Sequence, residues 1–311
     1  MDLRPTITPV RGTLPPPLSR GIGWPWGDAT TAPSRTAALD LPKITIVTPS
    51  YNQGRYLEAT IRSVLLQHYP NLEYIVMDGG STDQSVSIIR HYEAWLTSWT
   101  SARDGGQSAA INNGISKGTG ELLAWLNSDD HYLPGVLWTI AETALAHPEA
   151  DVFSGGSERL DADGRSLGIF MAPGLTHAEM LRWPGHHLPQ PSCFFRRRAW
   201  ETSGPLDETL NHQMDYDLWL RMSRASTFLR IDQVLSREVR HENAKNVSLP
   251  AECLVEHWLI QQRYDPQTAQ SEMVATVREY QRLQRRAQAV ACSRWYRWLR
   301  PLTNLLFPRA S

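Results

Sequence analysis

Short segments that are apolar on both faces alternate with segments of helical periodicity over residues 43–130. The first, KITIVT at residues 43–48, is short and β-branched, as a central strand of a parallel sheet is. The segment RYLEATIRSVLLQ that follows places its apolar residues three and four apart, which is the spacing of one helical face. Three further strand candidates and two further helices follow before residue 130. This order predicts an α/β domain with a Rossmann-like, mostly parallel sheet flanked by helices.

Pattern and composition divide the chain into three regions. Residues 1–42 are rich in Pro, Thr, Gly and Arg and show no period of 2 or 3.6, which predicts an irregular arm on the domain surface. Residues 43–250 form the expected folded domain, with regular alternation over 43–130 and a looser pattern over 131–250. Residues 251–311 are predicted to be a helical C-terminal extension.

Charge and cysteine content exclude several classes of protein. The net charge of −1 gives no bias towards nucleic acid, and no partner of that class is expected. No run of about 18 apolar residues is present, so no membrane-spanning helix is expected. The three cysteines lack metal-site spacing, and the N-terminus lacks the order of a signal peptide. Together these features predict a cytoplasmic protein.

Polar residues gather where the predicted strands end. In an open parallel sheet, ligands bind beyond the carboxyl ends of the strands. Each polar cluster alone has an explanation as a turn or a helix cap, but four of them on one edge predict a ligand site. The clusters comprise Pro49, Ser50, Tyr51, Asn52, Asp78, Arg103, Asp104, Gly106, Asn127, Ser128, Asp129 and Asp130.

The paired carboxylates of WLNSDD directly follow the buried segment ELLAWL. An unpaired charge is costly at such a position, and a bound Mg²⁺ or Mn²⁺ that also contacts substrate phosphates would offset the cost for Asp129. For Asp130 a second interpretation stays open, namely the cap of a helix expected to start near Pro134. Neither GxxxxGK[ST] nor GxGxxG follows the first strand, which argues against a P-loop enzyme or a dehydrogenase.

Four blocks, taken in order, resemble the family 2 glycosyltransferases: TPSYNQGRYLEATIRSVLLQ, YIVMDGGSTDQS, GISKGTGELLAWLNSDD and MDYDLWLRM. DGGSTD with WLNSDD is most similar to the bacterial branch that builds surface polysaccharides. The resemblance implies a GT-A fold, with a donor half at 43–130 and an acceptor half at 131–250. It also implies an inverting enzyme that moves a sugar from a nucleotide-diphosphate sugar to a hydroxyl of a glycan or lipid-linked acceptor. Such transfer would be assisted by a divalent metal, Mn²⁺ or Mg²⁺.

The resemblance also implies roles for individual residues. Asp215 takes the position of the general base, and the alternative explanation for it is an acid favoured in the first turn of a helix. Asp129 takes the position of the direct metal ligand, and His241 resembles a late His that some relatives bring to the metal or diphosphate. Asp217 is expected to be structural. Donor-binding roles are implied for Pro49, Tyr51, Asn52, Asp78, Asp104, Gly106, Asn127 and Ser128.

Three positions depart from the family pattern. Gly79 stands where many members have a second Asp whose carboxylate meets the base, Asn127 replaces an Asp, and Met214 replaces a Glu. These departures favour one alternative, a non-catalytic module that binds a sugar nucleotide or a glycan. A second alternative is a nucleotidyltransferase, which would release pyrophosphate, although no basic loop near the first strand supports it.

The acceptor side is expected around GHHLPQP, with Trp183 and Gln190 lining a pocket. From Arg278 the chain is dense in Arg, with Glu279 as its only acid. Together with Trp295, Trp298 and Leu299, this pattern predicts a basic amphipathic helix on an anionic membrane surface, at the inner face of the cytoplasmic membrane. An ordinary helix packed on the domain is the alternative.

Overall fold

The computed structural model describes most of the chain between residues 14 and 292. The chain divides into two compact units, Met1–His257 and Trp258–Ser311, whose boundary falls inside helix α9 (Pro250–Tyr264). No helix in the described part is long and apolar enough to cross a membrane. The described residues are 14–19, 21, 23–27, 40–172, 175–181, 188–241 and 250–292.

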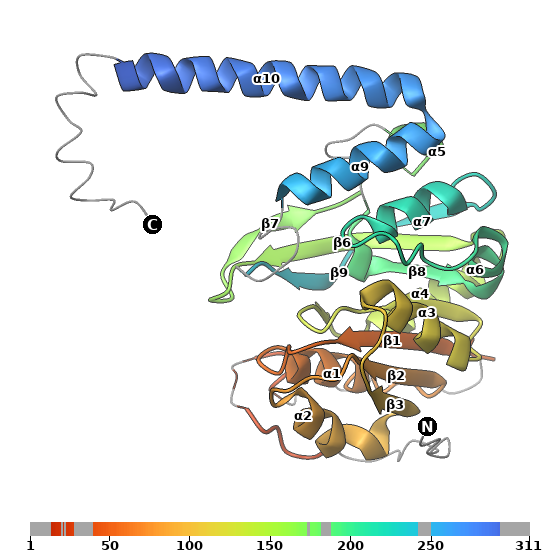
Figure 1. Cartoon of the computed structure of the whole chain (residues 1–311). Helices are drawn as coiled ribbons and strands as arrows, with labels where there is room; N and C mark the ends of the chain where they lie inside the picture. Colours follow the sequence, from red (N-terminus) through yellow and green to blue (C-terminus); the bar gives the residue numbers. More distant parts are fainter. Residues whose placement is uncertain are drawn as a thin grey trace. The chain divides into compact units, whose positions relative to one another are not determined.

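A parallel sheet forms the first half of the folded unit, as the alternating pattern predicts. The central strand β1 (Ile44–Ser50) pairs in parallel with β2 (Leu72–Asp78) on one side and with β4 (Leu122–Trp125) on the other. The short strand β3 (Ser98–Ser101) pairs in parallel with β2 and forms the edge of the sheet (Figure 1). The predicted α/β class with a mostly parallel, helix-flanked sheet is confirmed.

Helices cover both faces of these strands. Apolar residues of α1, α2 and α4 share one buried cluster with Ile44 and Ile46 of β1. The helix α3 (Gln107–Lys117) covers the opposite face, where a Cβ on Gly114 would overlap the Val47 side chain. Successive residues of β1 therefore face different helices, which explains why its sequence is apolar throughout. The three helices on the first face are α1 (Leu57–Leu65), α2 (Ser85–Tyr92), which continues as the 3₁₀ turn η1 (Glu93–Trp95), and α4 (Val136–Ala146).

The second half of the sheet is mixed. Strand β8 (Cys193–Arg196) runs antiparallel between β4 and β6 (Val152–Leu160), and β6 pairs in parallel with β9 (Phe228–Val239). The two-residue strand β5 (His131–Tyr132) closes the order β3-β2-β1-β4-β8-β6-β9-β5. Strand β7 (Ser166–Phe170) forms a hairpin with β6 through the turn expected at Asp163-Gly164. A strand of two residues carries no period, so the sequence pattern does not predict β5.

Aromatic side chains hold the remaining helices against this sheet. The rings of Trp125 and Trp219 are stacked with centroids 5.6 Å apart, and Phe195 lies edge-on to Trp219 and stacks on Trp200. These contacts fix α7 beside the end of β4. The elements of this layer are α5 (His177–Met180), η2 (Gln190–Ser192), α6 (Arg197–Ser203) and α7 (Met214–Met222).

The second unit contains the rest of α9 and the long helix α10 (Pro266–Cys292) (Figure 1). Ile260 and Ala269 are buried within it, and Gln261 donates a hydrogen bond of 2.8 Å to Glu272. Trp295, Trp298 and Leu299 of the predicted amphipathic tail lie outside the described residues.

The described part of the N-terminal arm is bound to α1. The Glu58 carboxylate accepts hydrogen bonds from the main-chain N–H groups of Leu18 and Ser19, at 2.6 and 2.8 Å. One turn later, Arg62 donates to the Pro25 carbonyl at 3.0 Å. A buried carboxylate and guanidinium on successive turns of one helix thus satisfy both donors and acceptors of an irregular segment.

A polar stripe on α1 holds the segment that follows β4. The Thr60 hydroxyl lies 2.9 Å from the Ser128 carbonyl and 2.7 Å from the Asp130 carbonyl. Ser63 accepts from the Tyr132 N–H, and Gln67, just past the helix, donates to the Leu133 carbonyl. Thr60, Ser63 and Gln67 are all buried. Residues 128–133 are therefore fixed by side chains of α1 rather than by a sheet ladder along their whole length.

We expect Thr60→Val to destabilise the folded unit by about 1–3 kcal/mol, because it leaves buried carbonyls without a donor at nearly constant side-chain volume. Urea unfolding followed by tryptophan fluorescence measures the effect. Thr143→Val is the matched control, since within the described part of the chain the Thr143 hydroxyl bonds only to the Thr139 carbonyl of its own helix. Its effect should stay within about 0.5 kcal/mol. Equal effects of the two variants would contradict the proposed anchoring.

Candidate active site

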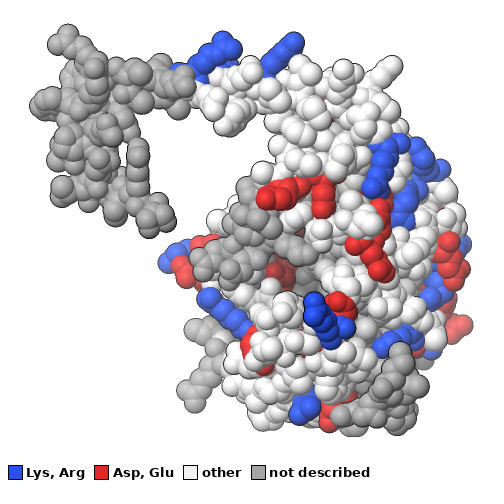
Figure 2. All heavy atoms as spheres, viewed as in Figure 1, with Lys and Arg blue, Asp and Glu red and all other residues white. Residues whose placement is uncertain are grey.

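A cleft of about 1010 Å³ opens at the carboxyl ends of β1, β2 and β4. Its other wall comes from α7, the end of β9 and the start of α9. In the space-filling view the molecule is hollowed near the middle of the face shown, and acidic side chains lie in and around the hollow (Figure 2). The predicted site residues that line the cleft are Pro49, Ser50, Tyr51, Arg103, Asp104, Gly106, Asn127, Ser128, Asp129, Asp130, Gln190 and Asp215.

Three predicted site residues are not among the residues that line the cleft. Asp78 is buried, and its carboxylate accepts hydrogen bonds from Ser81 and Ser101, so it shapes the turn after β2. The Asn52 side chain accepts from the Thr82 N–H at 2.8 Å and joins the first loop to the same turn. His241, the third, contacts Asp129 from below the surface.

Asp129 and His241 form a buried pair at one end of the cleft. The Asp129 Oδ2 atom lies 3.0 Å from His241 Nε2, and the imidazole stacks on the Tyr56 ring with centroids 4.6 Å apart. A fifth of the Asp129 side chain remains exposed to the cleft, whereas His241 is almost fully covered. Carboxylate and imidazole are both metal ligands, and they converge here from segments far apart in sequence. The two side chains are suited to supply part of the ligand set of a divalent cation.

The described residues contain no group of three or more His, Cys, Asp or Glu side chains placed to hold a metal ion. A hard cation at Asp129 would therefore take further oxygen ligands from water or from a bound phosphate group. That arrangement is usual for Mg²⁺, which is commonly held by one or two carboxylates together with substrate phosphates.

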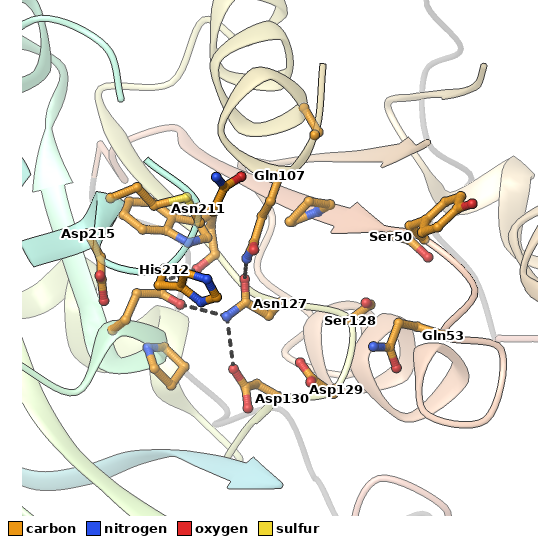
Figure 3. Close-up of a pocket in the computed structure, with 18 of the residues that line it drawn as sticks. Ser50, Gln53, Gln107, Asn127, Ser128, Asp129, Asp130, Asn211, His212 and Asp215 are labelled. Atoms are coloured by element: carbon orange, nitrogen blue, oxygen red, sulfur yellow. Dashed lines mark hydrogen bonds between the residues drawn. The ribbon is translucent and has the colours of Figure 1, made fainter. Parts of the chain in front are cut away.

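The Asn127 side chain lies at the centre of a hydrogen-bond network (Figure 3). Its carbonyl oxygen accepts from Gln107 Nε2 at 2.8 Å, and its amide nitrogen donates to Gln190 Oε1 at 3.1 Å and to Asp130 Oδ2 at 3.3 Å. Gln190 in turn donates to the Trp125 carbonyl at 2.9 Å. Asn127 thus ties α3, η2 and the turn after β4 together across the floor of the cleft. Sequence analysis missed Gln107, which is twenty residues away in the chain.

Asp130 faces the cleft and does not cap the next helix. That helix begins at Val136 after Gly135, and no side chain caps it, so the capping interpretation is wrong. Burial raises the pKa of Asp130 well above its ordinary value, and the neighbouring charge of Asp129 raises it further. Hydrogen bonds from Asn127 and from the Val239 main chain oppose the shift. The sequence places the two carboxylates side by side but does not indicate which way either points.

Asp215 lines the opposite side of the cleft from Asp129 (Figure 3). It sits in the first turn of α7, and burial raises its pKa to about 6, with a smaller contribution from the charge of Glu238. A carboxylate of this pKa can exchange a proton near neutral pH. Asp217, two residues on, is buried and pairs with Arg221 at 2.8 Å, as a structural acid does.

The start of α7 is oriented by Glu256 of α9. Its carboxylate accepts hydrogen bonds from the main-chain N–H groups of Asn211, His212 and Gln213, at 2.9, 2.8 and 3.0 Å. These residues line the cleft just before Asp215. Met214 is buried, and its sulfur accepts a hydrogen bond from the Ser108 hydroxyl of α3. The packing of Met214 therefore holds α7 against α3.

Several lining residues carried no signal in the sequence. Arg159 and Glu238 form a partly buried ion pair at 3.3 Å across β6 and β9. Both belong to hairpin and strand segments whose pairing is not apparent from local periodicity. Trp183, His186 and His187, from the segment expected to line the acceptor pocket, lie outside the described residues. Lining residues that sequence analysis did not single out include Gln53, Gln107, Arg159, Asn211, His212, Gln213, Glu238 and Arg240.

Solved structures share this fold. The structure of residues 1–349 of S. aureus TarS in complex with UDP-GlcNAc matches 70% of this chain and 65% of its own, with a TM-score of 0.56 and 18% identity. Mannosyltransferase PcManGT from Pyrobaculum calidifontis, in complex with GDP-Man and Mn²⁺, matches 83% of this chain and 82% of its own, with the same TM-score and identity. The expected GT-A fold is confirmed.

Sequence comparisons give the family. An uncharacterized glycosyltransferase of Rickettsia typhi is 29% identical over 214 residues, 65% of each chain. Chondroitin synthase of Escherichia coli is 24% identical over 209 residues, 65% of this chain and 29% of the synthase. The chain thus spans less than two thirds of the length of either relative. The family model for glycosyl transferase family 2 matches residues 45–203, just over half of the chain, and the chain belongs to that family.

Proposed function

We propose that this chain is an inverting glycosyltransferase that moves a sugar from a nucleotide-diphosphate sugar to a hydroxyl of a glycan or lipid-linked acceptor. The observation that carries the proposal is the pairing of two features in one cleft. Asp215, with a pKa near 6, lies on one side, and the Asp129–His241 pair lies on the other. A base and a cation site on opposite sides suit a single displacement, in which the attacking and departing groups lie on opposite sides of the reacting carbon.

In this mechanism Asp215 takes the proton of the acceptor hydroxyl while the hydroxyl oxygen attacks the anomeric carbon. The bond from that carbon to the diphosphate oxygen breaks at the same time, which inverts the anomeric configuration. Asp129 and His241 would hold the divalent cation, Mn²⁺ or Mg²⁺, whose charge stabilises the departing nucleoside diphosphate. The Asn127 network keeps the floor between the two sides rigid. The ligands bound in the TarS and PcManGT structures, nucleotide sugars in both and Mn²⁺ in one, support this assignment.

The raised pKa of Asp215 favours catalysis over the alternative of a non-catalytic binding module. A buried carboxylate that must be desolvated destabilises a fold, and a module that only binds sugars has no use for one at this position. The nucleotidyltransferase alternative would release pyrophosphate instead of a nucleoside diphosphate. Product analysis by chromatography distinguishes the two.

We also propose that the chain acts at the inner, cytoplasmic face of the membrane, where lipid-linked acceptors are available. Helix α10 carries an exposed apolar stripe of Met273, Val277, Tyr280 and Leu283, each at least 41% exposed. Arginines project from other faces of the same helix, and basic side chains are visible along it at the top of the view (Figure 2). These arginines are Arg278, Arg282, Arg285 and Arg286. Exposed apolar and basic faces on one helix are typical of binding at an anionic bilayer surface.

Replacing the base should abolish transfer but spare the donor site. We expect Asp215→Asn to lower turnover by about 10²–10⁴-fold, because the amide cannot accept the proton. Calorimetry should show unchanged binding of the nucleotide sugar in the presence of Mn²⁺. Asp232→Asn, which changes an exposed carboxylate on β9, is the matched control. Substantial turnover by Asp215→Asn would exclude Asp215 as the base, and a wild type without turnover on any donor would support the binding module.

The raised pKa of Asp215 predicts opposite pH trends for activity and stability. Activity, measured as kcat/KM, should rise with pH around about 6 as the base ionises. Folding favours the protonated carboxyl, because its pKa lies above the ordinary 3.8, so this contribution to stability is complete below about pH 4 and is lost as the pH rises through 6. The loss has a slope of at most roughly 1.4 kcal/mol per pH unit. As the pH rises from about 4 to about 6, Asp215→Asn should therefore become more stable relative to wild type. A stability difference that does not change with pH would contradict the shift.

Membrane binding is tested by sedimentation with vesicles. The full chain should sediment with vesicles that contain anionic phospholipid and much less with pure phosphatidylcholine, and added salt should weaken the interaction. Arg282→Gln combined with Arg285→Gln should reduce binding. The control is Arg165→Gln, an exposed arginine at the tip of the β6–β7 hairpin. Equal sedimentation of the double variant and wild type would exclude α10 as the binding surface.

A further inference from the structure

Two adjacent glycines follow β2, and a different physical requirement explains the glycine at each position. Gly80 has a φ of +84°, a left-handed conformation that disfavours other residues. Gly79 has no such φ, and its N–H continues the sheet pattern by donating to the Ser50 carbonyl at 2.8 Å. A Cβ on Gly79 would instead lie 3.3 Å from Asp104 Oδ2 and 3.4 Å from Tyr51 Cδ2. The backbone thus tolerates a side chain at position 79, but the Asp104 carboxylate and the Tyr51 ring occupy its space.

The Asp104 carboxylate is held in this place by its own loop. Its Oδ1 atom accepts a hydrogen bond from the Gly106 N–H at 2.8 Å, and Gly106 has a φ of +102°. Among the described residues, Oδ2 has no hydrogen-bond partner, and the side chain is exposed on the cleft wall. Asp78, the nearest other acid, uses both of its carboxylate oxygens for the turn and for Ser101. Asp104 therefore has hydrogen-bonding capacity for a ligand that Asp78 lacks.

Tyr51 completes a flat slot at the end of the cleft. Its side chain is 63% exposed, although aromatic rings of this size usually bury more of their surface. The ring, the carboxylate and the bare main chain of Gly79 thus meet at this end of the cleft, because one point above Gly79 lies 3.4 Å from the ring and 3.3 Å from the carboxylate. A planar heterocycle fits such a space, since it can stack on the ring and present N–H groups to the carboxylate.

We propose that Asp104 recognises the nucleobase of the donor by accepting a ring N–H, which selects uracil, thymine or guanine. Each of these bases carries an N–H at the centre of its pairing edge, whereas adenine and cytosine carry a lone pair that the carboxylate would repel. The inference rests on the proposed function, because the base belongs to the same donor. It goes further by assigning base selection to one side chain and by naming the class of base.

Calorimetric titration with UDP, GDP, ADP and CDP, each with Mn²⁺, tests the proposal on the full chain without requiring turnover. We expect UDP or GDP to bind at least about tenfold more tightly than ADP and CDP, as a charged hydrogen bond provides. Asp104→Ala should remove this preference. Asp163→Asn, at an exposed hairpin tip, should retain it. Circular dichroism confirms that each variant is folded.

A reciprocal variant separates a specific role from general damage. Asp104→Ala frees the space above Gly79, so Gly79→Asp in the same chain places a carboxylate at nearly the same point. The double variant should restore the preference for UDP or GDP to within about threefold of wild type. This range is narrower than the expected tenfold preference, which corresponds to about 1.4 kcal/mol. Gly79→Asp alone should bind both nucleotides more weakly than wild type, because two carboxylates then compete for one space.

The outcomes distinguish the inference from the function on which it rests. A wild type that binds none of the four nucleotides contradicts the proposed donor site and the inference together. Binding of all four with similar affinity, or a preference that survives Asp104→Ala, overturns the inference alone and leaves the proposed transferase intact. A preference that is lost in Asp104→Ala and restored in the double variant establishes Asp104 as the specificity residue.

Discussion

The cleft depends on how the segment after β4 is held. Residues 128–133 carry Asp129 and Asp130 away from the sheet, and most of their main-chain groups have no partner in a ladder. The buried Thr60 and Ser63 hydroxyls of α1 supply those partners, and Trp24 of the N-terminal arm donates to the Tyr132 carbonyl from the other side. A helix that is amphipathic in the ordinary sense would present only apolar residues here. The polar residues on its buried face are explained by the loop that they hold.

The acids of the folded unit separate into two groups by how their burial is compensated. Asp78 is surrounded by hydrogen-bond donors, and Asp217 is paired with Arg221, so partners within the protein compensate the burial of both carboxylates. Asp130 and Asp215 accept hydrogen bonds from Asn127 and from main-chain N–H groups, but burial outweighs these bonds and raises the pKa of each. Both of these acids line the cleft. Since a fold gains nothing from such groups, their presence indicates a ligand or a reaction that uses them.

The sequence predicted the strands and helices of the first half well, because residues on both faces of β1 contact helices and so leave a continuous apolar signature. It also placed Asp129 and Asp215 in one site, through the motifs that resemble the family. It could not show that Asp130 turns into the cleft, since side-chain direction in an irregular turn has no period. Nor could it show the contacts of Gln107 with Asn127 or of Glu256 with the start of α7, which join residues twenty or more positions apart.

Position-by-position comparison treats Gly79 as the loss of a carboxylate from the donor site. The fold changes that conclusion, because the loop after β3 brings the Asp104 carboxylate to the space above the glycine. Parallel strands make such an exchange straightforward: β2 and β3 are neighbours, and the loops at their carboxyl ends open onto the same cleft. A chemical group required at one point can therefore come from either loop. The small residue at one position and the acid at the other then depend on each other, since a second side chain would not fit.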